Sequence, residues 1–307
     1  MKSHLLSGQA ARALLACALA APAAAFAQTT FNISFTDPGA AYTSYYADLT
    51  RSITAAGNTW LSYFPTDRPT TELSINVNFA DIPTLAATSA DVSLVGQVNG
   101  IDTYGWSAPT KVLTGNDING DSPDALLYVG LNYLQNVLWY DPTGGSAGST
   151  IPSNKVDAYS AIMHEFGHIW GFNGWRDGST GLLPGDYQST FDSLVTLDAS
   201  APGGPTLFFT GAHAEAVYGG PVPLTFGNYG HLSNPGARDG NDLLNDLMNG
   251  VAFNTGRHYN ISALDIAVLQ DTGLPLNAMP VPEPGTIQLM LAGLAMALLW
   301  RRPQSVR

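Results

Sequence analysis

The chain has 307 residues, a formal net charge of −12 and a single cysteine. Between residues 28 and 279 the imbalance is larger, because seven Lys and Arg stand against 23 Asp and Glu, a net charge of −16. Nucleic acid is therefore not expected as a partner, since phosphate binding requires a basic surface. The acidity suits solubility and favours cationic substrates or calcium.

Residues 1–27 predict a secretory signal peptide. Lys2 and Arg12 supply its positive end, residues 13–20 its apolar stretch, and Ala25-Phe26-Ala27 its cleavage site. Cys17 lies within this segment in a loose likeness to a lipoprotein processing site, but the apolar stretch before it is too short for us to favour lipidation. Cleavage after Ala27 leaves a mature chain without cysteine, which excludes disulfides and thiolate zinc ligands.

Residues 28–279 predict one large domain, with an N-terminal lobe to about residue 171 and a loop-rich C-terminal lobe over 172–276. Residues 37–60 begin with a predicted turn at Asp37-Pro38-Gly39, and helical spacing from Tyr42 to Ile53 then predicts an amphipathic helix, whose tyrosines we expect to pack in the core. Alternation predicts a half-buried strand over 73–79, and 92–98 and 126–131 are further strand candidates.

Two segments before the central motif carry weaker signals. Residues 116–124 have oxygen-bearing side chains at alternate positions, as calcium loops do, but Tyr128 stands where an EF-hand needs a glutamate. A polar turn is therefore favoured over a Ca2+ site. Residues 132–141, which include Trp139 and Tyr140, are expected to flank a cleft.

The strongest signal is His164-Glu165-Phe166-Gly167-His168, an H-E-x-x-H pattern. Residues i and i+4 share one face of a helix, so His164 and His168 can bind one metal ion. Zinc on neutral imidazoles lowers the pKa of a bound water, and Glu165 is placed to take its proton. The predicted helix begins near Ser153, whose hydroxyl would cap it, and ends at Gly171 in a left-handed turn.

A third ligand must come from elsewhere. A short-spaced ligand would stand six residues beyond His168, but Gly174 occupies that position. We favour His231, because it precedes Asp246-Leu247-Met248-Asn249-Gly250, which resembles the methionine turn beneath the zinc of metzincins. The alternatives left open are His213, Glu215, His258 and Asp177.

The chain closes with a predicted helix over 261–272, in which Ser262 and Asp265 form a capping box and Gly273 a stop. Val281-Pro282-Glu283-Pro284 then precedes an apolar run over 285–300 and two arginines. The run is short for a membrane span, although a plain single-pass anchor is an alternative. This order resembles the PEP-CTERM sorting signal of Gram-negative bacteria. The resemblance implies an exosortase partner, transient membrane association of residues 280–307, and delivery to the cell surface or extracellular matrix.

His164, Glu165, His168, Gly171, a long insertion, His231 and Met248 are similar in order to the leishmanolysin-like metzincins. The resemblance implies an α+β zincin fold, with a twisted mixed sheet and a central zinc helix. It also implies one catalytic Zn2+ on His164, His168 and His231, with Glu165 as the general base of a metalloendopeptidase that acts on protein or peptide substrates. Some metzincins have a further catalytic tyrosine near the methionine turn. No tyrosine stands two residues after Met248 here, and Tyr229 is the substitute that the sequence offers. The alternatives are a non-catalytic zinc-stabilised surface or matrix protein and a zinc amidase of a non-protein substrate.

Overall fold

A computed structural model describes residues 29–142, 149–198, 206–232, 243–250 and 253–278. The predicted signal peptide and the predicted sorting tail lie outside the described residues. None of the helices in the described ranges is long and apolar enough to cross a membrane.

The main sheet has four strands in the order β1-β2-β6-β3. Three of them are parallel, β1 (Thr29–Thr36), β2 (Thr71–Ala80) and β6 (Ala125–Gly130), while β3 (Leu85–Ser89) runs antiparallel at the edge. In β2 the alternate side chains of Leu73, Ile75 and Val77 are buried, because successive residues of a strand face opposite sides. These apolar side chains require a cover on one face of the sheet.

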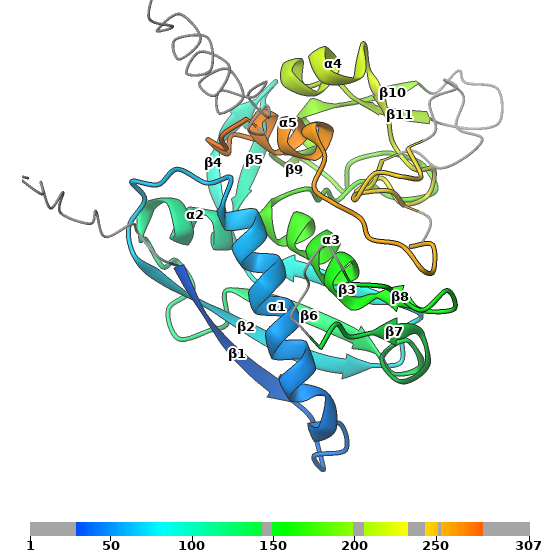
Figure 1. The fold of residues 1–307 in the computed structure, drawn as a ribbon. Helices are drawn as coiled ribbons and strands as arrows, with labels where there is room; N and C mark the ends of the chain where they lie inside the picture. Colours follow the sequence, from blue (N-terminus) through cyan, green and yellow to red (C-terminus); the bar gives the residue numbers. More distant parts are fainter. Residues whose placement is uncertain (1–28, 143–148, 199–205, 233–242, 251–252, 279–307) are drawn as a thin grey trace, which may run out of the picture.

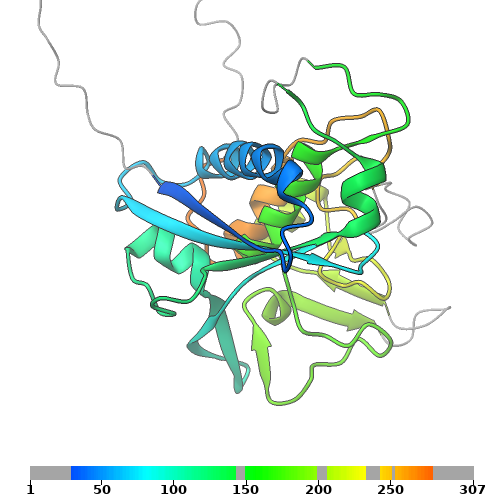
Figure 2. The same ribbon diagram turned by 90° about the horizontal axis from the view of Figure 1, so that it is seen from below.

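Two helices supply that cover, α1 (Tyr46–Leu61) and α3 (Ala158–Trp170), which lie together over one face (Figures 1 and 2). Trp60 joins them, because its indole N–H donates a hydrogen bond of 2.8 Å to the backbone carbonyl of Met163. The core between the helices and the sheet thus holds α3 in a fixed position.

A second set of elements extends the N-terminal lobe. The hairpin of β4 and β5 turns at Asn99 and Gly100, both with positive φ, and β9 adds to it in parallel. The elements are β4 (Val92–Val98), β5 (Ile101–Trp106), α2 (Ser107–Thr114), the π-helical turn η2 (Tyr133–Val137), β7 (Leu138–Trp139), β8 (Val156–Asp157) and β9 (Tyr187–Ser189).

The C-terminal half lies above α3 in Figure 1. The last residue of α5 (Ala263–Asp271) binds the first turn of α4 (Ala212–Tyr218). The Asp271 carboxylate accepts hydrogen bonds from the N–H groups of His213 and Ala214. The elements are η3 (Asp192–Leu194), β10 (Val195–Asp198), β11 (Thr206–Phe209), α4 (Ala212–Tyr218), β12 (Val222–Pro223) and α5 (Ala263–Asp271). The fold is α+β with a mixed sheet, as predicted.

The turn predicted at Asp37 is confirmed, because the Asp37 carboxylate accepts the N–H groups of Ala41 and Tyr42. The helical spacing begins at Tyr42 in the sequence, whereas the α-helix begins at Tyr46, after the 3-10 turn η1 (Thr43–Tyr45). Strands over 73–79, 92–98 and 126–131 are confirmed to within two residues. The closing helix is confirmed with its capping box, and Gly273 follows it at φ +103°.

Candidate metal centre

Helix α3 carries the H-E-x-x-H motif and has a defined cap at each end. The Asp157 carboxylate accepts the N–H of Ser160, so the helix begins at Ala158 and not near Ser153. Val156 and Asp157 are extended because they pair with Leu138 and Trp139, which prevents an earlier start. Gly171 ends the helix at φ +115°, as predicted, a conformation that favours glycine.

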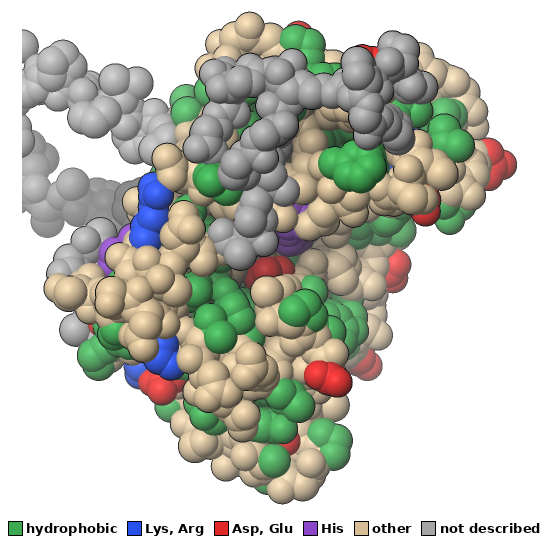
Figure 3. All heavy atoms as spheres, turned by 90° about the vertical axis from the view of Figure 1, so that its right-hand side faces the viewer, with side chains coloured by type: hydrophobic (Ala, Val, Ile, Leu, Met, Phe, Trp, Pro, Cys, Tyr) green, Lys and Arg blue, Asp and Glu red, His purple; other side chains and the backbone are tan. Residues whose placement is uncertain are grey.

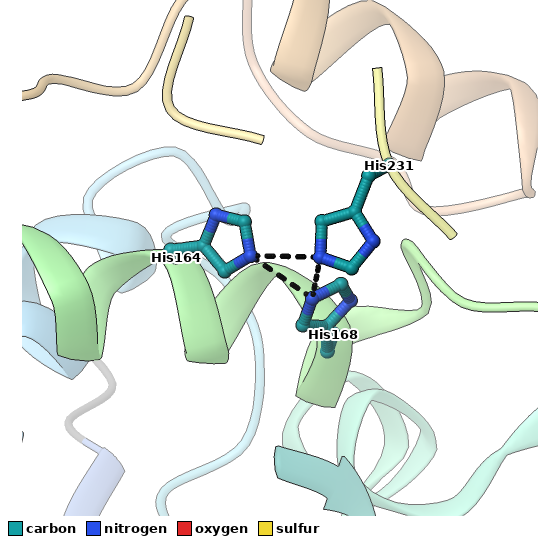
Figure 4. A group of neighbouring side chains, drawn as sticks. All are labelled: His164, His168 and His231. Carbon is teal, nitrogen blue, oxygen red and sulfur yellow. Dashed lines mark hydrogen bonds between the residues drawn. The ribbon is translucent and has the colours of Figure 1, made fainter. Parts of the chain in front are cut away.

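The structure brings His164, His168 and His231 together (Figure 4). The Nε2 atoms are 3.1 Å apart between His164 and His168, 3.0 Å between His168 and His231, and 3.1 Å between His231 and His164. Two rings come from one face of α3, and the third comes from the C-terminal half. The ligand atoms of these three histidines all lie within 4.8 Å of one another. In the described ranges they form the group of His, Cys, Asp or Glu side chains that could hold a metal ion.

Hydrogen bonds at the other ring nitrogens orient two of the imidazoles. His164 Nδ1 is 2.6 Å from the carbonyl of Leu247, and His168 Nδ1 is 2.7 Å from the carbonyl of Phe172. A carbonyl only accepts, so each Nδ1 carries the proton and each Nε2 presents a lone pair. Burial, with the neighbouring His168 as a second cause, lowers the pKa of His164 to about 3, and burial lowers that of His168 to about 4. Burial also lowers the pKa of His231.

These features fit a zinc ion. Lone pairs of neutral imidazoles that face one another repel unless a cation lies between them, and zinc takes imidazole nitrogens at about 2.0–2.1 Å. The carbonyl partners of His164 and His168 are the outer contacts that orient metal-bound histidines.

Glu165 lies beside the three rings and is 6% exposed. Its Oε2 atom is buried and has no hydrogen-bond partner among the described residues. Burial raises the pKa of Glu165 to about 8, and a hydrogen bond from the backbone of Ala87 in β3 acts in the opposite direction. One oxygen is thus tied to the sheet edge, while the other is left for a ligand.

The three imidazoles and Glu165 line a cavity of about 170 Å³ between the N-terminal and C-terminal halves. Figure 3 shows histidine close to an acidic side chain in the hollow between the upper and lower parts of that face. The other lining residues are Thr84, Leu85, Tyr133, Ala161, Asn228, Asn249, Gly250 and Phe253.

The segment from Leu247 to Asn249 lies against α3, where the sequence placed a methionine turn. Met248 is fully buried, and its side chain fills the space beside Gly167. The Met248 carbonyl accepts the N–H of Leu232, and the His231 carbonyl accepts the N–H of Thr225. His231 is therefore held in place by backbone bonds on both sides.

The other candidates for the third ligand lie elsewhere. His213 is exposed on α4 and binds Asp271, while Glu215 belongs to the same helix. His258 Nδ1 is 2.8 Å from Asp157, at the opposite end of α3 from Gly171. Asp177 accepts hydrogen bonds from Ser179 and Thr180 in a local turn.

Gly174 stands where a short-spaced third ligand would be. A Cβ atom there would clash with the carboxylate of Asp192, which is 2% exposed and accepts the N–H groups of Trp175 and Ser189. A side chain at Gly174 is thus excluded by the packing of the C-terminal half.

The segment 116–124 forms a turn around Asp117. The Asp117 carboxylate accepts the N–H groups of Asn119 and Gly120 and forms an ion pair with Lys111. Its oxygens are used within the protein, and calcium binding stays an untested prediction.

The sequence did not reveal two contributions to the site, those of Tyr133 and of strand β3. Residues 132–141 do reach the cavity, but through Tyr133 and not through Trp139 or Tyr140. The alternation Leu85-Ala86-Ala87 is too weak in apolar contrast to mark a strand. Neither segment carries a motif that could have linked it to the histidines.

The PEP-CTERM protein-sorting motif matches residues 280–302. The chain therefore carries a membrane-associated C-terminal sorting signal of an exported protein, which an exosortase-type enzyme recognises. No curated protein and no solved structure matches the chain. The likeness to leishmanolysin-like metzincins thus depends on the motif residues alone.

Proposed function

We propose that this protein is a zinc-dependent endopeptidase that is delivered to the surface or extracellular matrix of a Gram-negative bacterium. The observation that carries the proposal is the convergence of three imidazole Nε2 atoms within 3.1 Å beside the buried carboxylate of Glu165. Zinc bound there would supply a Lewis acid and an activated water. A purely structural zinc site normally takes four protein ligands and has no use for a base.

In this proposal each residue has one task. His164, His168 and His231 hold the ion through Nε2, while the carbonyls of Leu247 and Phe172 keep two rings oriented. Glu165 takes the proton of the attacking water and delivers it to the leaving amine.

Strand β3 favours an extended peptide as substrate. It is the edge strand on the side of the sheet that faces the cavity, and its pairing with β6 is antiparallel. The Thr84 carbonyl accepts the N–H of Gly130, so in the alternating pattern Leu85 and Ala87 turn their backbone groups away from β6. The Ala87 N–H is taken by Glu165, but a peptide can add to this edge through the backbone groups of Leu85 and the carbonyl of Ala87, with its scissile bond near Glu165.

The test measures zinc content and casein cleavage on the purified protein and on Glu165→Gln. We expect one zinc per chain in both and cleavage by the parent alone, with a loss of at least about 1,000-fold in the variant. Undiminished cleavage by Glu165→Gln would refute the mechanism. Zinc without cleavage in the parent would instead favour a non-catalytic zinc-stabilised surface protein or an amidase.

A further inference from the structure

Tyr133 forms part of the cavity wall without a structural task for its hydroxyl. It is the first residue of η2, directly beyond the end of β6, and its ring is 8% exposed and packs in the core. A π-helical turn is rare and often marks a functional site. The turn brings a phenol from the N-terminal half to the cavity that the three histidines and Glu165 line.

The Tyr133 hydroxyl differs from those of Tyr159 and Tyr259, which are paired within the fold. Tyr159 pairs its hydroxyl with Thr59 at 2.6 Å, and the Tyr259 hydroxyl accepts the N–H of Asn254. No group in the described ranges hydrogen-bonds the hydroxyl of Tyr133, and yet the oxygen is not sealed off, in contrast to that of Tyr140. A polar group in this position is satisfied by water or by a ligand.

The surroundings of Tyr133 keep it a hydrogen-bond donor. Burial raises its pKa to about 12, and the charge of Glu165 contributes to the shift. The phenol therefore retains its proton at any pH at which a peptidase works. Tyr133 and Glu165 line the same cavity.

We propose that Tyr133 is a catalytic residue, whose hydroxyl donates a hydrogen bond to the carbonyl oxygen of the scissile peptide bond as its carbon becomes tetrahedral. This inference rests on the proposed endopeptidase function. Negative charge develops on that oxygen during attack, and a fixed donor stabilises it more in the transition state than in the bound substrate.

Tyr229 is the competing candidate, because it lies two residues before His231. Its hydroxyl oxygen is buried, and the influences on its pKa besides burial come from the backbone of Gly227 and from Asp177. It lines a second cavity, with Arg176 and Gly178, and is not among the residues that line the cavity of Glu165 and Tyr133. Tyr229→Phe is thus the matched control for Tyr133→Phe.

The first experiment compares kcat and KM of the full protein with those of Tyr133→Phe and Tyr229→Phe. We expect Tyr133→Phe to lower kcat by about 10- to 100-fold with KM changed by less than about threefold. Tyr229→Phe should stay within about twofold of the parent. An unchanged kcat in Tyr133→Phe, while the parent cleaves, overturns this inference and leaves the endopeptidase proposal intact. A parent that cleaves no peptide overturns both.

The second experiment needs no turnover. In the Glu165→Gln background, calorimetry compares the affinity for a phosphinic peptide, which imitates the tetrahedral carbon, with that for the uncleaved peptide of the same sequence. We expect Tyr133→Phe to weaken phosphinic binding at least about tenfold and peptide binding less than about threefold. An equal loss for the two ligands, or loss of zinc in the variant, would show a structural role and refute the proposal.

Discussion

Met248 fills the space beside Gly167, one residue before the second histidine of the motif. A Cβ atom on Gly167 would lie 2.8 Å from the Cε atom of Met248 and closer still to its sulfur. The neighbouring carbonyl of Leu247 accepts the Nδ1 proton of His164, so one turn contacts α3 at two points. The contact between Met248 and Gly167 therefore limits how closely the turn approaches α3. The hydrogen bond from His164 to the Leu247 carbonyl orients the His164 ring.

Gly167→Ala tests this contact. Alanine favours a helix by about 1 kcal/mol over glycine, but overpacking a core costs about 1–3 kcal/mol, and Met248 is fully buried. We expect a net loss of up to about 2 kcal/mol in the free energy of unfolding, measured by urea denaturation.

The double variant Gly167→Ala/Met248→Ala serves as the control for this prediction. Removing the methionine side chain makes room for the new methyl group, so the double variant should lose less stability than the two single variants together. Strictly additive losses would show that the two side chains do not meet.

The start of α3 gives a second prediction. Asp157 accepts hydrogen bonds from the N–H and hydroxyl of Ser160 and from His258, whereas Ser153 is exposed. Asp157→Ala should cost about 1–2 kcal/mol of unfolding free energy as a lost cap, and more because the Nδ1 atom of His258 also loses its partner. Ser153→Ala should change the melting temperature by less than about 1 °C. The reverse ranking would restore Ser153 as the cap.

A third prediction concerns the change of stability between pH 5 and 8. Burial raises the pKa of Asp265 well above its usual range, and the charge of Asp246 and a hydrogen bond to it add to the shift. A carboxyl with a raised pKa in the folded state stabilises the fold fully below its unfolded pKa, and this stability declines as pH rises through the folded pKa. The decline is at most about 1.4 kcal/mol per pH unit.

Asp265→Asn removes this titration and keeps the side-chain shape. The variant should gain stability over the parent as pH rises from 5 to 8, in chemical denaturation at matched ionic strength. Parallel curves for the two proteins would show that Asp265 does not carry the raised pKa.

A fourth prediction separates the candidates for the third ligand. His231→Ala should weaken zinc binding by at least about 100-fold in competition with a chelating dye, because its Nε2 atom completes the set at 3.0–3.1 Å. His213→Ala should bind zinc as the parent does, since His213 is exposed and pairs with Asp271. Equal zinc affinity in parent and His231→Ala would exclude His231.

The sequence predicted what local patterns determine. His164, Glu165 and His168 follow from helical spacing, and Ser262 with Asp265 follows from a capping box that the structure contains. The start of α3 was missed because Ser153 and Asp157 are both good caps. The pairing of β8 with β7, a tertiary contact, decides between them.

Other parts of the site depend on contacts between distant segments. Strand β1 was missed because it begins directly after the predicted cleavage site, although Phe31, Ile33 and Phe35 alternate in it. Tyr133 reaches the cavity of the histidines because η2 follows β6, and β3, the neighbour of β6 in the sheet, packs against α3. No periodicity around Tyr133 indicates this, so only the folded chain shows the contact.

The separation of His168 and His231 by 63 residues has a thermodynamic consequence. Bringing the ends of such a segment together costs about 4 kcal/mol in chain entropy. Backbone bonds at Thr225, Leu232 and Met248 hold His231 in position, so folding of the C-terminal half covers this cost before any ion arrives. If zinc binds as proposed, its affinity is linked to the integrity of the whole domain, and a substitution that loosens the distant half should weaken it with every ligand intact.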